Sequence, residues 1–556
     1  MNELSKITNP GRYGALIIFF LGIALLIPQI WSETSITGQD EYWLSLRTPI
    51  ETLEHGSWLT PWVNDEPRLK KPPLLYWAIL LTYKILGINL FAARIWGVLS
   101  GAGLALCSFL IYRKLFNRSS MLAGFITLGT LAVTIEGRRA MLDLPLAFFV
   151  CMAVFFALKW GDSGRWRWIL LSAISIGLSF MVKGPIGFIF FGSASVAALT
   201  VFRKWGFAFS RWMQIAAAFL LLLAICLPWP LTMAFMWPDY FSIIRGELAQ
   251  RQPQDLNLFA PLSALRKGLV LVFPWTLILV AAIISSLKNA GKMVSRRSLW
   301  LALWFLISLI PCFFMQCFSR YMVPIIPAAS VLSANWLEGV SWAIKNTLFR
   351  LSMSLAAFFT LLLCVFFMWF GRGPLIALAC LLLTAVLLWI TFLKNDIPLA
   401  TLCLCLLLTL MIGGLYPCLG INSLPADIEK VIGHAPAASY NSSQPSMLSI
   451  RLKRSVKRIR SFDEKDINML RQFNGFLFVR ENEARDFETL AGKLGIAFNK
   501  EGYFKTFWSR KTWIRFARED VTLDDWKKAI SLRSLADLRT GIFYYRLSHD
   551  PSIRRS

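Results

Sequence analysis

The chain has 556 residues, of which 56% are hydrophobic and 16% are charged, and its mean hydropathy is +0.56. Its apolar residues lie in long blocks rather than at the spacing of amphipathic core helices, which is typical of a polytopic membrane protein. The formal net charge of +26 would suggest nucleic acid as the partner of a soluble protein. Most basic residues before residue 420, however, lie in short loops between apolar runs, where Lys and Arg set topology. Nucleic acid is therefore not expected as a partner.

The first apolar run extends from about Gly14 to Trp31 and follows Lys6 and Arg12. No small-residue cleavage site follows it, so we expect a retained anchor and not a signal peptide. With a cytoplasmic N-terminus, the polar stretch over residues 32–73 lies outside. The next apolar segment, PLLYWAILLTYKILG, is short for a span and is predicted to lie in or dip into the interface.

Further spans are predicted near residues 91–112, 120–135, 144–159, 166–182, 185–202, 211–236, 267–287, 298–317, 322–342, 350–370, 374–393 and 398–417, which with the first run makes thirteen transmembrane helices. The basic loops that connect them, such as YRKLFNR, fall on the predicted cytoplasmic side. Several basic residues fall instead on the outer side: Lys70, Lys71, Arg138, Arg139, Lys183, Arg245, Arg251 and Arg320. Positive charge there needs another reason, and an anionic ligand is one.

After Gly420 the composition changes to mixed charged and apolar segments. GFLFVRE is predicted to form a strand, and ENEARDFETLAGKLG a helix with a glycine stop. An odd number of spans puts this part outside, so the sequence predicts a membrane domain over residues 1–419 and an external soluble α/β domain over residues 420–556. RLKRSVKRIR, from Arg451 to Arg460, is predicted as a helix with a basic stripe that faces either solvent or anionic head groups.

Three charged clusters converge on the predicted outer face. They are GQDEYW with Asp40 and Glu41, RLKKPPLLYW with Lys70 and Lys71, and EGRRAMLDLP with Asp143. Transfer of a membrane-borne sugar phosphate needs a base for the acceptor hydroxyl and cations for the leaving phosphate. The ten cysteines lie in or beside apolar runs without zinc or redox spacing, and the chain has three histidines, so no metal site is predicted.

The charged residues also have plain structural interpretations. Asp40 and Glu41 could be the N-cap and first-turn acid of a helix in a solvated loop. Asp143, at the mouth of a span, would be desolvated unless it is paired, and Arg138 or Arg139 could be that partner.

The order of DEYW, KKPPLLYW, RRAMLDLP, KGP at residues 183–185 and SRYMVPIIPA at residues 319–328 resembles that of the bacterial GT-C glycosyltransferases that use polyprenyl-phosphate sugars. Within these, the chain is most similar to the lipid A aminoarabinose transferases, which are related to protein O-mannosyltransferases. The resemblance runs from the first span to about residue 330. It implies a GT-C fold in the bacterial inner membrane, with the active site and the C-terminal domain facing the periplasm.

The resemblance also implies roles for individual residues. Asp40 matches a base or acceptor-orienting residue, Asp143 a second catalytic carboxylate, and Lys71 a ligand of the lipid phosphate. Glu41 is a further catalytic candidate, although it would point elsewhere than Asp40 on a helix. One position departs from the pattern, because Lys70 stands where these enzymes commonly have Glu.

Further phosphate ligands are expected around the same site. Tyr321, beside Arg320, matches a family tyrosine near the donor phosphate. Arg138 and Arg139 are two more candidates to hold phosphate. The donor is already activated, so no nucleotide and no P-loop is needed. No cofactor is expected, and nothing in the sequence indicates a divalent metal.

We therefore expect an inner-membrane glycosyltransferase that moves one sugar, such as 4-amino-4-deoxy-L-arabinose or a related sugar, from undecaprenyl phosphate to lipid A or another envelope glycolipid. The main alternative is O-glycosylation of periplasmic proteins, which the outer domain would serve by gripping a polypeptide. A transporter of the same lipids would predict internal repeats and interrupted helices in matching halves, and the sequence shows no such repeat. A non-catalytic scaffold is a third option.

Overall fold

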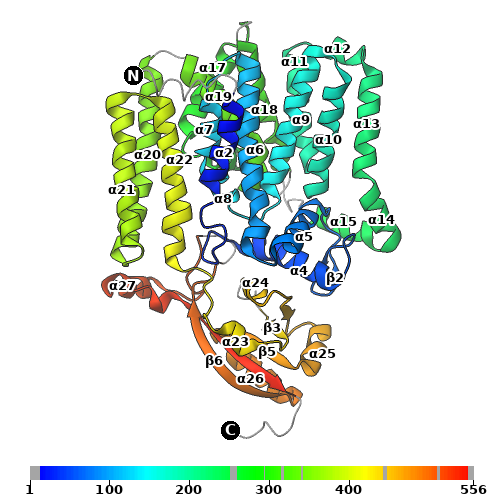
Figure 1. Ribbon diagram of the computed structural model, residues 1–556, viewed down its shortest axis with the longest axis vertical. Helices are drawn as coiled ribbons and strands as arrows, with labels where there is room; N and C mark the ends of the chain where they lie inside the picture. Colours follow the sequence, from blue (N-terminus) through cyan, green and yellow to red (C-terminus); the bar gives the residue numbers. More distant parts are fainter. Residues whose placement is uncertain are drawn as a thin grey trace.

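The structure is a computed structural model that describes residues 13–250, 260–292, 295–314, 318–339, 342–441, 447–509 and 514–548. Lys6, Arg12, Arg251 and Cys317, which entered the sequence analysis, lie outside the described residues. The chain forms a helical bundle with a smaller sheet-containing domain at one end (Figure 1).

The bundle is built from long helices joined by short helical turns. The α-helices are α2 Gly14–Leu26, α6 Leu90–Phe116, α7 Leu122–Leu128, α8 Leu131–Glu136, α9 Asp143–Ser163, α10 Trp166–Lys183, α11 Ile186–Val201, α12 Trp205–Phe209, α13 Trp212–Cys226, α14 Pro228–Met236, α15 Tyr240–Ala249, α16 Ala260–Leu271, α17 Thr276–Lys288, α18 Arg296–Ile307, α19 Ile326–Gly339, α20 Trp342–Trp369, α21 Pro374–Trp389 and α22 Ile397–Leu410. The turns are η4 Ile310–Phe313, η5 Ser319–Ile325, η6 Ile390–Lys394, η7 Met411–Leu415 and η8 Tyr416–Leu419.

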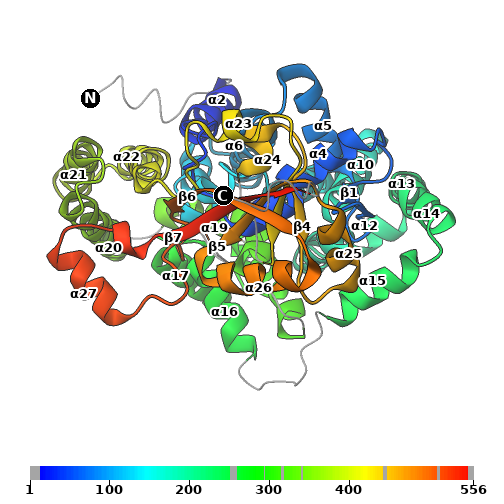
Figure 2. The same ribbon diagram turned by 90° about the horizontal axis from the view of Figure 1, so that it is seen from below.

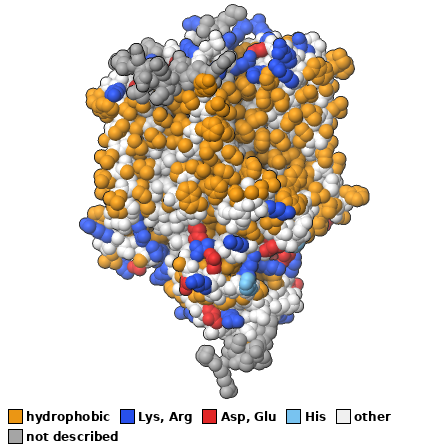
Figure 3. Space-filling model, viewed as in Figure 1, with side chains coloured by type: hydrophobic (Ala, Val, Ile, Leu, Met, Phe, Trp, Pro, Cys, Tyr) orange, Lys and Arg blue, Asp and Glu red, His pale blue; other side chains and the backbone are white. Residues whose placement is uncertain are grey.

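The bundle has the surface of a membrane protein. On the face shown in Figure 3, apolar side chains form a belt across its middle, and charged side chains gather at the two ends. Within the described ranges, eight helices are long and apolar enough to cross a membrane, and the bent pair of α16 and α17 could supply a ninth crossing. The helices α2 and α11 are shorter and also apolar. A multi-span membrane protein is confirmed, whereas the predicted count of thirteen spans is not.

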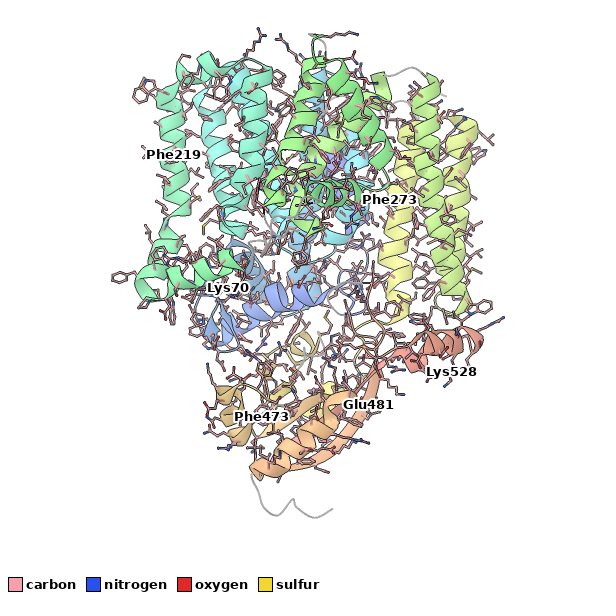
Figure 4. All side chains as sticks on the ribbon, turned by 180° about the vertical axis from the view of Figure 1, so that it is seen from behind. Lys70, Phe219, Phe273, Phe473, Glu481 and Lys528 are labelled. Carbon is pink, nitrogen blue, oxygen red and sulfur yellow. The ribbon has the colours of Figure 1, made fainter. Side chains whose placement is uncertain are left out.

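Two of the predicted spans are not continuous helices. The span predicted over residues 120–135 breaks between α7 and α8, and α16 meets α17 at an angle of 119°. The two breaks face each other, because the Leu131 N–H donates to the Phe273 carbonyl at 3.0 Å and the Trp275 Nε1 donates to the Gly129 carbonyl at 3.2 Å. Figure 4 marks Phe273 at this junction. Backbone polar groups in hydrocarbon must find partners within the protein, so each break satisfies the other.

The segment between α2 and α6 covers the lower end of the bundle in Figure 1. It consists of α3 Gln39–Glu41, η2 Tyr42–Leu46, α4 Arg47–Glu54, the hairpin of β1 Trp62–Val63 and β2 Glu66–Pro67, and α5 Leu74–Leu86. The helix α5 is the segment predicted to lie at the interface, and it sits beside α4 at the edge of the apolar belt. This segment separates the bundle from the sheet domain.

The C-terminal domain is a mixed five-stranded sheet with the order β4-β3-β5-β7-β6. Its elements are α23 Ile428–Ile432, β3 Ala437–Tyr440, α24 Leu448–Leu452, β4 Lys457–Ile459, α25 Glu464–Gln472, β5 Gly475–Arg480, η9 Glu481–Glu483, α26 Ala484–Leu494, β6 Ala497–Thr506, α27 Leu523–Ser531, η10 Ala536–Leu538 and β7 Thr540–Ser548. The strand β3 is parallel to β4 and β5, and β7 is antiparallel to β5 and β6. The register of β5 and β7 runs from the pair Gly475 and Leu547 to the pair Arg480 and Ile542.

Side chains along β5 alternate between the two faces of the sheet, and helices cover both faces. Leu477 and Val479 pack in the cluster that contains α25 and α26, whereas Phe476 and Phe478 pack on the other face with α23 and α24. The predicted strand GFLFVRE and the predicted helix with its glycine stop are both present, and Gly495 ends α26 with a φ of +67°. The helix α27 leaves the sheet and lies beneath α20 and α21 (Figure 2).

The predicted helix over Arg451–Arg460 is wrong. The helix α24 ends at Leu452, Lys453 takes a left-handed conformation with φ +53°, and the chain then continues into β4. The guanidinium of Arg451 donates to Glu33 at 2.9 Å and to Glu429 at 2.7 Å. The basic segment therefore holds the C-terminal domain against the segment that follows α2.

Candidate active site

Four charged side chains meet at the end of the bundle that faces the C-terminal domain. Asp40 comes from α3, Asp143 from the first residue of α9, Lys183 from the last residue of α10, and Arg320 from η5. A carboxylate at a helix N-terminus and an ammonium at a helix C-terminus both match the helix dipole. The local sequence therefore places Asp143 and Lys183 where a neighbouring pair of helices brings them together.

Arg320 connects the two carboxylates of this group. Its Nη1 forms an ion pair with Asp40, and its Nε lies 3.8 Å from Asp143 Oδ2. Lys183 Nζ forms an ion pair with Asp143 Oδ1. We call Asp40, Arg320, Asp143 and Lys183 the bridged cluster. Tyr321 covers it, because Lys183 Nζ lies 3.9 Å from the centre of the tyrosine ring.

The members of the bridged cluster differ in their access to solvent. The side chains of Asp143 and Lys183 are 2% and 5% exposed, whereas that of Asp40 is 37% exposed. Burial opposes the charge on Arg320, but Asp143 and Asp40 outweigh it and raise the pKa of the guanidinium. Arg320 therefore supplies a permanent positive charge, and Asp40 is the carboxylate that a ligand can reach.

Glu41 lies next to Asp40 in the chain but belongs to another cluster. Its side chain is fully buried, and its Oε1 accepts from Arg94 Nε and from the Ala140 N–H, each at 2.9 Å. Arg94 also donates to the carbonyls of Ile30 and Ser32, at 3.0 and 2.9 Å. Glu41 thus ties α6 to the loop before α9. This placement indicates that Glu41 stabilises the fold, and it does not support the predicted catalytic role.

The two arginines of EGRRAMLDLP do not reach Asp143. Arg139 Nη1 donates to Glu136 at 2.8 Å, and its Nε lies 3.9 Å from Glu41 Oε2. These carboxylates outweigh burial and raise the pKa of Arg139. Arg138 is fully buried, and its guanidinium donates to the carbonyls of Thr134 and Leu25, at 2.8 and 2.6 Å. In the described residues Asp143 pairs with Lys183 and Arg320 instead of with either arginine, and the role of Arg138 and Arg139 as phosphate ligands stays a prediction.

The lysine pair of RLKKPPLLYW lies beside α15. Lys71 Nζ bonds Glu247 Oε1 at 3.2 Å, and Lys70 Nζ lies 3.8 Å from Glu247 Oε2. Lys70 is the more exposed of the two, with 49% of its side chain exposed against 14% for Lys71. A carboxylate thus accompanies the predicted phosphate ligand, although it comes from a residue distant in the sequence.

Sequence reasoning missed two of these contacts. The sequence predicts Lys183 within KGP as an outer-side charge but not as a member of the site, and its violation of the loop rule is the signal that could have identified it. Glu247 gave no signal, because it stands alone in a helix far from the motifs. In the part of the chain that the structure describes, no group of three or more His, Cys, Asp or Glu residues is arranged to hold a metal ion.

Comparisons with known proteins place the chain among sequences and folds that it resembles. A family profile described as dolichyl-phosphate-mannose-protein mannosyltransferase matches residues 12–243, which include three members of the bridged cluster. An undecaprenyl phosphate-alpha-4-amino-4-deoxy-L-arabinose arabinosyl transferase of Pseudomonas aeruginosa (strain UCBPP-PA14) is 26% identical over 336 residues, or 54% of this chain and 57% of that protein. An uncharacterized protein of Aquifex aeolicus (strain VF5) is 30% identical over 139 residues, or 25% of this chain and 28% of that protein. The matches therefore cover at most 57% of the length of these two relatives.

The fold extends this likeness along the chain. The crystal structure of ArnT from Cupriavidus metallidurans bound to undecaprenyl phosphate has a TM-score of 0.69 and 17% identity, and the match covers 96% of this chain and 98% of that one. Its apo state has a TM-score of 0.67 and 16% identity, with 95% and 96% covered. The predicted GT-C fold is confirmed, and so is the predicted resemblance to polyprenyl-phosphate-sugar glycosyltransferases, most like the lipid A aminoarabinose transferases.

Proposed function

We propose that this chain, a membrane protein with the GT-C fold, transfers one sugar from undecaprenyl phosphate to lipid A or a related envelope glycolipid on the periplasmic face of the inner membrane. The sugar is 4-amino-4-deoxy-L-arabinose or a close relative. The observation that carries the proposal is Arg320, which joins the partly exposed Asp40 to the buried Asp143 at the end of the bundle that faces the C-terminal domain. A lipid-linked donor would present its phosphate at this level.

The reaction needs one bond to form and one to break. The acceptor hydroxyl oxygen bonds to the anomeric carbon of the sugar, the bond from that carbon to the phosphate oxygen breaks, and the electron pair leaves with the phosphate. The hydroxyl proton passes to Asp40, which is the accessible carboxylate. Asp143 remains paired with Lys183 and holds Arg320 in place.

Cations near the site stabilise the negative charge that develops on the leaving phosphate. Arg320 is one of these cations, and Lys71, which shortly precedes α5, is the second. Tyr321 limits the space beside Lys183. The phosphate of a polyprenyl donor is already a competent leaving group, so the proposed mechanism contains no general acid.

The test is a transfer assay with purified full-length protein, undecaprenyl-phosphate-linked aminoarabinose and lipid A, read by mass spectrometry of the lipid. Wild type is expected to add one sugar per acceptor site. Asp40→Asn should lower turnover by at least about a hundredfold, since a positioned base contributes roughly a hundredfold to ten-thousandfold. Normal turnover by a folded Asp40→Asn variant would remove Asp40 from the chemistry.

A second candidate function is O-glycosylation of periplasmic proteins, which is favoured by the match of residues 12–243 to the mannosyltransferase profile. The same assay separates the two functions when a polypeptide acceptor replaces lipid A. Sugar on the polypeptide and none on the lipid would replace the first proposal with the second. Lipid modification alone would leave the first in place.

A further inference from the structure

A cavity of 470 Å³ lies at the end of the bundle opposite the bridged cluster. It opens among α9, α10, α11, α13 and α18, beside the short helix α12 at the top of Figure 1. Its walls are mostly apolar and include Val154, Leu158, Phe191, Ala198 and Trp300. The volume falls within the range of roughly 300–1,000 Å³ that is usual for ligand pockets.

The mouth of this cavity is basic. Its lining includes Lys114, Lys204, Arg296 and Arg297, and a single acid, Asp162, which forms an ion pair with Lys114. Among the described residues, Lys204, Arg296 and Arg297 form no ion pair with an acidic side chain, and Arg297 and Lys204 are exposed. Figure 3 shows Lys and Arg side chains gathered along this edge of the molecule, above the apolar belt. The mouth therefore carries an excess of positive charge.

The two arginines also occupy an unfavourable position for cations. They are the first two residues of the helix α18, and its first turn contains no acidic residue. The N-terminus of a helix repels positive charge and attracts anions. An anion at the mouth of the cavity would bond the guanidinium groups and lie at the favourable end of the dipole.

A ligand of one chemical class matches both parts of this cavity. The walls are mostly apolar, so an acyl chain would make dispersion contacts with them. Basic pockets between membrane helices on the cytoplasmic side bind anionic lipid head groups. The basic loops predict that this end is cytoplasmic. We propose that the cavity is a binding site for an anionic glycerophospholipid, with an acyl chain between α9 and α11 and the phosphate on Arg296, Arg297 and Lys204.

The experiment uses the purified full-length protein in detergent. The thermal unfolding midpoint is followed while phosphatidylglycerol or phosphatidylcholine with the same acyl chains is added. Phosphatidylglycerol should stabilise the wild type at a concentration at least about tenfold lower than phosphatidylcholine. Each basic residue near a head group contributes roughly fivefold in affinity, so the double variant Arg296→Gln, Arg297→Gln should lose most of this preference.

Two further variants separate the effect of charge from that of the cavity. Lys288→Gln removes an exposed charge at the end of α17 that does not line the cavity, and it should keep the preference. Ala198→Phe fills the cavity without a change of charge and should abolish the stabilisation even if the double arginine variant fails to fold. Sugar transfer is not measured, so the outcome is independent of the proposed function.

Several results would overturn the site. Equal stabilisation by the two lipids would show that the site does not distinguish an anionic head group from a zwitterionic one. The same stabilisation by inorganic phosphate would show that the apolar walls are not used. An equal loss in Lys288→Gln would show a diffuse surface effect, and an unchanged preference in Ala198→Phe would place the lipid elsewhere.

Discussion

Asp40 and Glu41 are neighbours in the chain with opposite surroundings. Asp40 is reached by solvent and by Arg320, whereas Glu41 is enclosed by Arg94 and the loop before α9. Their side chains point in different directions, because successive residues on a helix do not share a face. Substitutions that neutralise Asp40 and Glu41 should therefore have different effects.

We expect Glu41→Gln to damage the fold. The change leaves the buried guanidinium of Arg94 without its carboxylate, and breaking a buried ion pair in this way costs about 3–5 kcal/mol. The free energy of unfolding, or the unfolding midpoint in detergent, measures the effect. Asp40→Asn is the matched control and should unfold like the wild type, because its side chain is partly exposed. A Glu41→Gln protein as stable as wild type would contradict a structural role for Glu41.

Lys71 and Lys70 form a second matched pair of neighbours. Both contact Glu247, but Lys71 is the less exposed and is the expected phosphate ligand. Lys71→Ala should raise the KM for the lipid donor about tenfold or more with a smaller change in kcat, since a charge-assisted contact to phosphate is lost. Lys70→Ala should change the KM much less. Equal effects of the two substitutions would mean that only the local charge matters.

The sequence predicts Asp40, Asp143 and Lys71 as site residues, because each stands in a recognisable motif beside an apolar run. It did not predict which charges pair, since the partners of Asp143 come from the end of α10 and from η5. The arginine nearest to Asp143 in sequence was the natural partner to expect. The backbone of the loop before α9 turns Arg139 toward Glu136 and Glu41 instead.

At the scale of elements, most predicted helices are present, but the sequence does not predict the breaks that interrupt two of them. The residues around Gly129 and around Phe273 are apolar in both places, so hydropathy predicts two uninterrupted spans. The breaks are stabilised by hydrogen bonds between the two segments, which are 146 residues apart at the contact of Trp275 with Gly129. The local sequence pattern does not predict hydrogen bonds between segments so far apart in the chain.

The contact between α24 and the segment after α2 leads to a prediction about domain docking. Arg451 and Glu33 are partly buried, with 26% and 19% of their side chains exposed. A double-mutant cycle with Arg451→Ala and Glu33→Ala should give a coupling free energy of about 1 kcal/mol, at the upper end for such pairs. The unfolding midpoint is the measurement.

The same interface contains its own control pair. Lys465 and Glu66 also join the C-terminal domain to the external segment, but 72% and 65% of their side chains are exposed. Their coupling should be near zero, because solvent screens an exposed pair. If this pair coupled as strongly as Arg451 and Glu33, burial would not explain the strength of docking.

The whole molecule has two chemically different ends. One end carries the C-terminal domain and the bridged cluster, and the other carries α12 and the basic cavity mouth (Figure 1). The excess of basic loops at the second end predicts that it is cytoplasmic and that the first end is periplasmic.

Two exposed serines test this orientation. Ser531 ends α27 at the first end, and Ser210 follows α12 at the second. In intact spheroplasts, a membrane-impermeant maleimide should label Ser531→Cys, while Ser210→Cys should require permeabilisation. The unmodified protein serves as the control for its own cysteines. Labelling of Ser210→Cys alone would invert the molecule and place the candidate site in the cytoplasm.

The bridged cluster also sets an order for the synthesis of the protein. Lys183 follows Asp143 by 40 residues, so this ion pair can form as soon as the hairpin of α9 and α10 is made. Arg320 follows Asp40 by 280 residues, which ribosomes translating at about 5–20 residues per second make in roughly 14–56 s. From the synthesis of Asp143 until that of Arg320, the nascent chain contains both carboxylates without the guanidinium that joins them. A chain arrested before η5 is therefore inserted in the membrane and still lacks a site.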